Sequence, residues 1–232
     1  MKKIQLLLMA LFAFTIIKAQ TVEEIVKSYS KAHKLDQMED ISTIKISGTM
    51  SLMGMDMSYE MSAKKPDKMK VVINFQGQEI ITAIDGNKGY TINPMTGSSD
   101  PVEIDAAQVE QNSNSNVFNN YVDNYLKKGV LTLEGTENVN DKPAFKLKAA
   151  PDTNTTLYLF IDKDSYMLVK TTRNMVQDGM PVEADTFFSE YKDTDGVMLP
   201  MQTTTSASGM EILISYDKIE VNLPMEDSMF KL

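Results

Sequence analysis

The residues of this chain that could carry out chemistry are few and poorly arranged for it. The single histidine, His33, stands beside Lys34 near the end of a predicted helix, and no Gly-x-Ser-x-Gly motif offers it a nucleophile. Two Ser-x-x-Lys patterns, Ser28 to Lys31 and Ser62 to Lys65, lack the Ser-Asp-Asn and Lys-Thr-Gly companions of the catalytic motif. We therefore expect no catalytic residues, and we interpret His33 as a solvated residue at a helix end.

Metal-binding patterns are equally weak. One histidine and no cysteine exclude the usual zinc ligand sets. The segment from Asp162 to Ser165 begins like a calcium loop, but it lacks glycine at the sixth position and lies between two predicted strands. Asp193 and Asp195 also lie in a predicted turn. We interpret both segments as hairpin turns, and we expect no metal site and no cofactor.

The N-terminus has the pattern of a secretory signal peptide. Two lysines and an apolar run from Leu6 to Ile17 precede Ala19, after which cleavage is expected. A transmembrane anchor is the alternative, but this run is too short to span about 30 Å of hydrocarbon. Without cysteine the chain has neither a disulfide framework nor a site for N-terminal lipid attachment. We expect residues 1–19 to be removed and the product to be periplasmic, soluble and not lipid-anchored.

The charge balance excludes one class of partner. The chain has 23 Lys and Arg against 32 Asp and Glu, a formal net charge of −9. Loss of Lys2, Lys3 and Lys18 with the signal peptide changes this to −12. So acidic a surface repels phosphate backbones, and we expect no nucleic-acid partner. No Pro/Gly/Ser-rich linker divides the remaining residues, so the sequence predicts one domain over 20–232.

The elements that must position any site follow from hydrophobic periodicity. Thr21 and Glu24 fit a capping box ahead of an amphipathic helix. From Ile44 to Asn93 apolar and polar residues alternate through five segments with tight turns, which predicts antiparallel strands. Helical patterns return at Ile104 to Gln111 and at Asn116 to Lys128, where Asn116 is the expected N-cap. Strand patterns resume after residue 130 and bring the total to about eleven or twelve.

These elements favour a mostly β fold with an α-helical lid. A strongly curved antiparallel sheet of about eleven strands, an incomplete β-barrel, would bury the apolar alternation if it enclosed helices on its concave side. The helix expected at 116–128 has a broad apolar face, and we assign it as the lid. Its residues predicted to contact a ligand are Phe118, Tyr121, Val122 and Tyr125.

Six short motifs follow one another along the chain. A basic pair before a proline opens the first, at 63–71, and the second, at 84–94, joins an Asp-Gly turn to an aromatic strand that ends in Asn-Pro. The others are 133–147, 158–162, 191–200 and 222–230. Their joint order resembles the LolA-type family, the periplasmic carriers of outer-membrane lipoproteins. The resemblance covers nearly all of residues 20–232, and it implies a LolA/LolB-like fold with a greasy cavity and no catalytic function.

The resemblance also implies a latch. In the family an arginine just before the first proline hydrogen-bonds the helical lid and keeps the empty cavity closed. The matching residue here is Lys65, which lacks the planar five-donor fork of arginine and cannot hold several carbonyls in the same geometry. Lys65 is therefore our candidate for a weakened latch. The only arginine, Arg173, is expected in a solvated or paired surface role on a distant strand.

Alternation predicts which residues line the cavity. One side of the first three strands carries Met50, Leu52, Met57, Tyr59, Met61, Val71, Ile73 and Phe75. Methionine is unbranched and polarizable, so a lining rich in it can repack around acyl chains of different shape. Ordinary core filling is the alternative explanation of the 18 methionines.

Pattern and resemblance together predict a monomeric periplasmic carrier. It would bind the acyl chains of a lipoprotein, or a similar lipid, and sort it toward the outer membrane, with an inner-membrane release complex and an outer-membrane acceptor as partners. A lipid-binding sensor or regulatory protein of the same fold is the first alternative. An exported esterase is the second.

Overall fold

The computed structural model describes residues 20–232 except 115, 152, 154 and 178–179. The expected signal peptide, 1–19, lies outside the described residues, so its removal stays a prediction. Within the described part of the chain, no helix combines the length and the apolar character that crossing a membrane requires.

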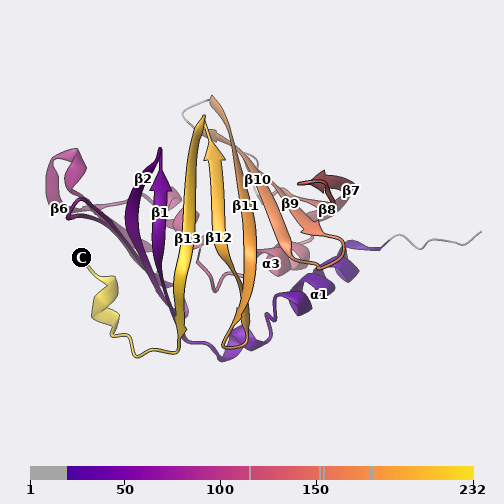
Figure 1. The fold of residues 1–232 in the computed structure, drawn as a ribbon, viewed down its shortest axis with the longest axis horizontal. Coiled ribbons are helices and arrows are strands. Elements are labelled where there is room, and N and C mark those ends of the chain that lie inside the picture. Colours follow the sequence, from indigo (N-terminus) through magenta and orange to yellow (C-terminus); the bar gives the residue numbers. More distant parts are fainter. Residues whose placement is uncertain (1–19, 115, 152, 154, 178–179) are drawn as a thin grey trace, which may run out of the picture.

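One antiparallel sheet forms the body of the molecule (Figure 1). Its first six strands are β1 (Thr43–Leu52), β2 (Met55–Lys64), β3 (Lys68–Phe75), β4 (Gln78–Asp85), β5 (Lys88–Asn93) and β6 (Ser98–Glu103). The other seven are β7 (Leu131–Val139), β8 (Lys142–Ala149), β9 (Thr155–Asp162), β10 (Leu168–Gln177), β11 (Met180–Thr194), β12 (Val197–Ala207) and β13 (Met210–Val221).

The sheet consists of two meanders that meet at a central seam. The spatial order runs from β6 back to β1, then to β13, and from β13 back to β7. At the seam β1 pairs with β13, for example Ile44 with Val221. The two edge strands, β6 and β7, are not paired with each other, so the curved sheet stays open. This confirms the expected fold class, an unclosed and curved antiparallel sheet with few helices.

The described residues contain thirteen strands rather than eleven or twelve, because β6 escaped prediction. The segment Ser98–Glu103 contains Pro101 and two acidic residues, and it lacks the alternation by which the other strands were found. As an edge strand it can accommodate a proline, which has no N–H to donate to a neighbour.

Among the residues that the structure describes, three helices and three short 3-10 segments accompany the sheet. They are α1 (Val22–Ala32), η1 (Gln37–Asp40), η2 (Pro94–Thr96), α2 (Ala106–Asn114), α3 (Tyr121–Lys127) and η3 (Asp227–Phe230). The expected capping box begins α1: the Thr21 hydroxyl accepts from the Glu24 N–H at 3.3 Å, and the Glu24 carboxylate accepts from the Thr21 N–H at 3.1 Å.

The helix expected at 116–128 begins later than predicted. The Asn116 side chain accepts from the Phe118 N–H at 3.0 Å and so stabilises a turn. The N-cap of α3 is Asn120, whose side chain accepts from the Asp123 N–H. Several asparagines in this segment could serve as a cap, and periodicity alone did not distinguish them.

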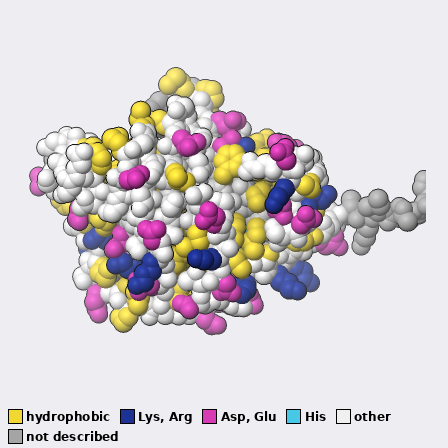
Figure 2. All heavy atoms as spheres, viewed as in Figure 1, with side chains coloured by type: hydrophobic (Ala, Val, Ile, Leu, Met, Phe, Trp, Pro, Cys, Tyr) yellow, Lys and Arg dark blue, Asp and Glu magenta, His cyan; other side chains and the backbone are white. Residues whose placement is uncertain are grey.

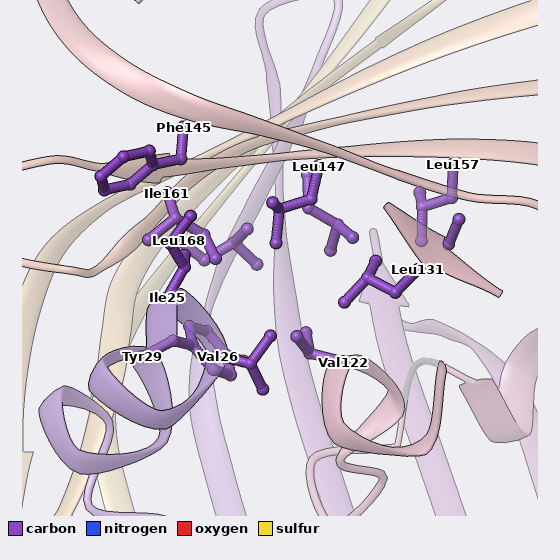
Figure 3. Packing of buried hydrophobic residues seen from close by; sticks show 12 residues of the cluster. Ile25, Val26, Tyr29, Val122, Leu131, Phe145, Leu147, Leu157, Ile161 and Leu168 are labelled. Atoms are coloured by element: carbon purple, nitrogen blue, oxygen red, sulfur yellow. The ribbon is translucent and has the colours of Figure 1, made fainter. Parts of the chain in front are cut away.

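Two main apolar clusters lie on the concave face of the sheet. In the first, α1 and α3 pack side by side against β7 to β10 (Figure 3). Its members drawn there with labels are Ile25, Val26, Tyr29, Val122, Leu131, Phe145, Leu147, Leu157, Ile161 and Leu168. The second cluster joins η1 and α2 to β1–β4, β12 and β13, with Met38, Ile44, Ile46, Tyr59, Met61, Ile84 and Val109 among its members.

Candidate functional site

Strand register brings the eight predicted lining residues to one face. Met50 lies opposite Met57, Met61 opposite Val71, and Tyr59 opposite Ile73. Leu52 and Phe75 share this face by alternation along β1 and β3. Five of the eight belong to the second cluster or pack against it, namely Met50, Tyr59, Met61, Val71 and Ile73. The face is therefore the concave one, and a ligand-binding role for these residues stays a prediction.

The cover over this face comes from η1, through Met38, and from the chain between β6 and α3. Ile104, Val109, Val117 and Phe118 all pack in or against the second cluster. The close approach depends on Gly89 of β5, where an added Cβ would lie 2.7 Å from the Ile104 side chain and 2.9 Å from that of Val109. Glycine is thus needed at this position for the cover to sit on the sheet. The sequence pattern gave no sign of this role.

The predicted lid residues divide between the two clusters. Phe118 packs against the second cluster, over the predicted cavity. Tyr121, Val122 and Tyr125 instead pack in or against the first cluster, next to α1. The expectation that one helix carries all four over the cavity mouth is therefore wrong, because the chain turns before α3 begins.

Lys65 connects the end of β2 to the cover. Its ammonium donates to the carbonyls of Met38 at 2.7 Å and Glu39 at 3.0 Å, both in η1. It also lies 5.2 Å from the centre of the Phe118 ring, in cation–π geometry. The carbonyls that it holds are thus those of η1 rather than of the helix expected at 116–128. Its role in gating stays a prediction.

Two pockets of the structure, of about 450 and 520 Å³, lie elsewhere on the sheet, and neither is lined by a predicted cavity residue. The larger is bordered by Tyr191, Met201 and Tyr216 on β11, β12 and β13. Five of the eight predicted lining residues instead pack in or against the cluster that includes side chains of the cover. A ligand on this face would therefore have to displace Phe118 and its neighbours.

His33 is buried, which corrects the expectation of a solvated helix end. Only 6% of the residue is exposed, and its Nε2 accepts from the Leu168 N–H at 3.1 Å. Its ring lies 4.3 Å from that of Tyr29 and meets Tyr191 edge-on at 5.2 Å. Burial lowers the pKa of His33 to about 4, so the ring is neutral at pH 7. Through these contacts His33, at the end of α1, joins the helix to β10.

Arg173 also departs from expectation, because it lies on the concave face. Its cross-strand partners are Leu157, a member of the first cluster, and Ala184. Burial, with a contribution from Tyr125, raises the pKa of Tyr121 to about 12, and the nearby charge of Arg173 opposes that rise. A register shift between Leu168 and Lys170 moves the inward positions of β10 from even to odd numbers. The expectation of a surface role rested only on the usual exposure of arginine.

Several solved structures share this fold. A DUF1329 family protein from Desulfovibrio piger matches with a TM-score of 0.60 and 17% identity, covering 89% of this chain and 97% of its own. A Vibrio parahaemolyticus domain, described as an outer membrane lipoprotein-sorting protein domain, matches with a TM-score of 0.61 and 13% identity. The match covers 91% of this chain and 96% of that domain. A LolA superfamily protein from Nitrosomonas europaea matches with a TM-score of 0.57 and 15% identity, and the match covers 92% of this chain and 99% of that protein.

These matches span nearly the whole described chain and show that it has a LolA-like fold. They confirm, at the level of the fold, the resemblance found in the sequence motifs. No protein-family model and no curated protein matches the sequence.

Proposed function

We propose that this protein is a carrier that binds the acyl chains of a lipoprotein, or of a similar lipid, on its concave face. One observation supports this most strongly: β1, β2 and β3 present eight apolar side chains to one face, beneath a cover of short segments. The LolA-like fold supports the same function, because one protein that shares it is described as a lipoprotein-sorting domain. The proposal involves no catalytic step.

The energy for binding would come from removing the acyl chain from water. Each buried methylene contributes about 0.8 kcal/mol, so a chain of about 15 methylenes gains about 12 kcal/mol. Displacing Phe118 and the rest of the cover costs part of this gain. Binding is therefore favourable only if the cover is weakly held. The η1 part of the cover is a segment of four residues, and the hydrogen bonds from Lys65 hold it to the end of β2.

One end of the sheet offers an apolar rim for ligand transfer. The β1–β2, β10–β11 and β12–β13 hairpins point to the same end, at the top of Figure 1. They expose Met53 by 77%, Met180 by 66% and Met210 by 52%. Hydrophobic side chains are visible at this end in Figure 2. Exposed methionines of this kind suit contact with a partner or a lipid during transfer.

The cellular setting belongs to the same proposal. Residues 1–19 would direct export and be removed, and residues 20–232 would act as a single carrier domain in the periplasm. An inner-membrane release complex would supply the cargo, and an outer-membrane acceptor would receive it.

Native mass spectrometry of the protein purified from its own cell envelope tests this function. We expect a mass increment equal to a triacylated lipoprotein or a lipid, which organic solvent removes. A stoichiometric complex with the domain of a membrane protein would instead favour the sensor. Protein that is always recovered without lipid, and that binds no added fatty acid, would contradict the carrier.

A further inference from the structure

The concave face is not apolar throughout, because a row of hydroxyl groups crosses β10, β11 and β12. Thr171 lies opposite Thr186, and Thr186 lies opposite Thr205. The hydroxyl groups of Thr186 and Thr205 are 3.0 Å apart and hydrogen-bonded. The row adjoins the predicted acyl surface, since Thr205 pairs with Ile212 on β13 and Ile212 pairs with Leu52 on β1. A polar strip thus borders the apolar lining.

Arg173 stands directly beside this row. It follows Thr171 by two positions on β10, so both side chains share one face. Across the sheet its neighbours are Ala184 on β11 and then Ala207 on β12. These residues present only methyl groups beside the guanidinium. Its direct partner on the other side is Leu157 on β9, so neither paired side chain can accept a hydrogen bond from the guanidinium.

The guanidinium has no counter-charge in the described part of the chain. The side chain of Arg173 forms no hydrogen bond or ion pair to a described residue, whereas eight lysines form ion pairs there. The acidic residues nearest along β11, Glu183 and Asp185, alternate with Ala184 and so lie on the opposite face. Asp185 is moreover bound by Lys170 at 2.8 Å.

An unpaired arginine on a half-buried surface is costly unless an anion binds to it. The five donors of a guanidinium match the oxygens of a carboxylate or phosphate, and these bonds strengthen where water is scarce. The chain has 32 acidic residues, and none of those that the structure describes forms an ion pair with its sole arginine. Two residues with hydroxyl groups, Thr171 on the same strand and Thr186 on the adjacent one, lie nearby as further donors.

We propose that Arg173 binds the anionic head group of the lipid whose acyl chain lies on the concave face. The head would carry a carboxylate or a phosphate, with Thr171 and Thr186 as supporting donors. This inference rests on the proposed carrier function and specifies its ligand class. From β10 the apolar strand β13 is three strand spacings away, about 14 Å, so a chain anchored at Arg173 extends onto the lining.

Binding of matched ligands tests the head-group site. The probes are the fluorescent cis-parinaric acid, its neutral methyl ester, and dodecyl phosphate as a competitor. Affinities are measured at pH 8 for the unaltered protein, Arg173→Met, Arg173→Lys and Lys148→Met. The last is a matched control, because Lys148 pairs with Tyr158 on the opposite face of the sheet and takes part in no ion pair to a described residue.

We expect the unaltered protein to prefer the acid to the ester by tenfold or more, as for a charge-assisted hydrogen bond. Arg173→Met should abolish that preference by weakening only acid binding, whereas Arg173→Lys should keep part of it and Lys148→Met all of it. Dodecyl phosphate should displace the acid from the unaltered protein. Dodecanoate serves as a second competitor, and the ratio of the two inhibition constants shows whether the site binds a phosphate or a carboxylate head group more tightly.

Other outcomes overturn the inference. Equal weakening of acid and ester in Arg173→Met would mean that the arginine only packs. Undiminished acid binding in that variant would place the head group elsewhere. Tight binding of the ester with no preference for the acid, in the unaltered protein, would leave the carrier intact but remove the anionic site. If neither ligand binds to the unaltered protein, the carrier function fails and this site with it.

Discussion

His33 and Leu168, from elements 135 positions apart in the chain, meet through one hydrogen bond, in which the imidazole Nε2 accepts from the Leu168 N–H at 3.1 Å. The same residue is held from its other side, since the Tyr191 hydroxyl donates to the Leu168 carbonyl at 2.7 Å. A ring that accepts at Nε2 must be neutral and carry its proton on Nδ1. Protonation of Nε2 would replace this attraction by two opposed donors.

Stability should therefore fall in mildly acidic solution. The pKa of His33 is about 4 in the folded protein and 6.5 in the unfolded chain, so the unfolded state binds the proton more tightly. The full contribution of neutral His33 to the free energy of unfolding is present above pH 6.5 and is lost as the pH falls toward 4. Between pH 7.5 and pH 5 we expect the free energy of unfolding to drop by about 2 kcal/mol from this group. Urea titrations at the two pH values measure the drop.

The non-titrating variant His33→Gln is the control for that experiment. It should be less stable at pH 7.5 but should lose about 2 kcal/mol less than the parent on going to pH 5. The acidic residues contribute equally to both proteins and cancel in the difference. Identical pH slopes for parent and variant would show that His33 does not titrate between the two states.

Introduction of a charge into the predicted lining should prevent lipid uptake. Met57 lies on the concave face opposite Met50, so Met57→Asp places a carboxylate where an acyl chain would lie. We expect uptake of cis-parinaric acid to be abolished. Ser58→Asp, at an exposed position on the other face of β2, is the matched control and should bind as the parent does. Normal uptake by a folded Met57→Asp variant would exclude this face as the binding surface.

The contacts of Lys65 should set how readily the cover opens. Lys65→Arg can form additional bonds to the carbonyls of η1 and so favours the closed state. Because the ligand needs the open state, a shift of about 1 kcal/mol lowers its apparent affinity about fivefold. Lys65→Met, which loses both bonds, should bind more tightly than the parent. Equal affinities for the three proteins, at one salt concentration, would show that this position does not gate.

Gly89 should be needed for the cover to seat on the sheet. In Gly89→Ala the new Cβ would lie 2.7 Å from the Ile104 side chain, which has to shift. We expect a loss of about 1–3 kcal/mol in the free energy of unfolding and faster hydrogen exchange over Ala106–Asn114. The second change Ile104→Val, which removes one of the crowded atoms, should restore part of both. Unaltered exchange in Gly89→Ala would mean that the cover adapts without opening.

The sequence predicted best where one period continued without interruption. Side chains alternate strictly along β2 and β3, so the inward positions of Tyr59 and Ile73 could be read directly. Arg173 could not be placed in this way, because an irregularity near Leu168 that no residue type announces reverses the alternation. His33 was misjudged for another reason. Its burial is created by Leu168 and Tyr191, whose proximity no local pattern encodes.

The seam between β1 and β13 has a consequence for the order of folding. Within each meander neighbouring strands are joined by hairpins and can pair as soon as both have been synthesised. The pairing of β1 with β13, which places Ile44 opposite Val221, is possible only after β13 has been synthesised. Until then two half-sheets coexist, each with an unprotected edge that could pair with another molecule. A chaperone that shields nascent β1 would thus protect the chain for most of its synthesis. The strand that closes the middle of the sheet, β13, is thus made after the other twelve described strands.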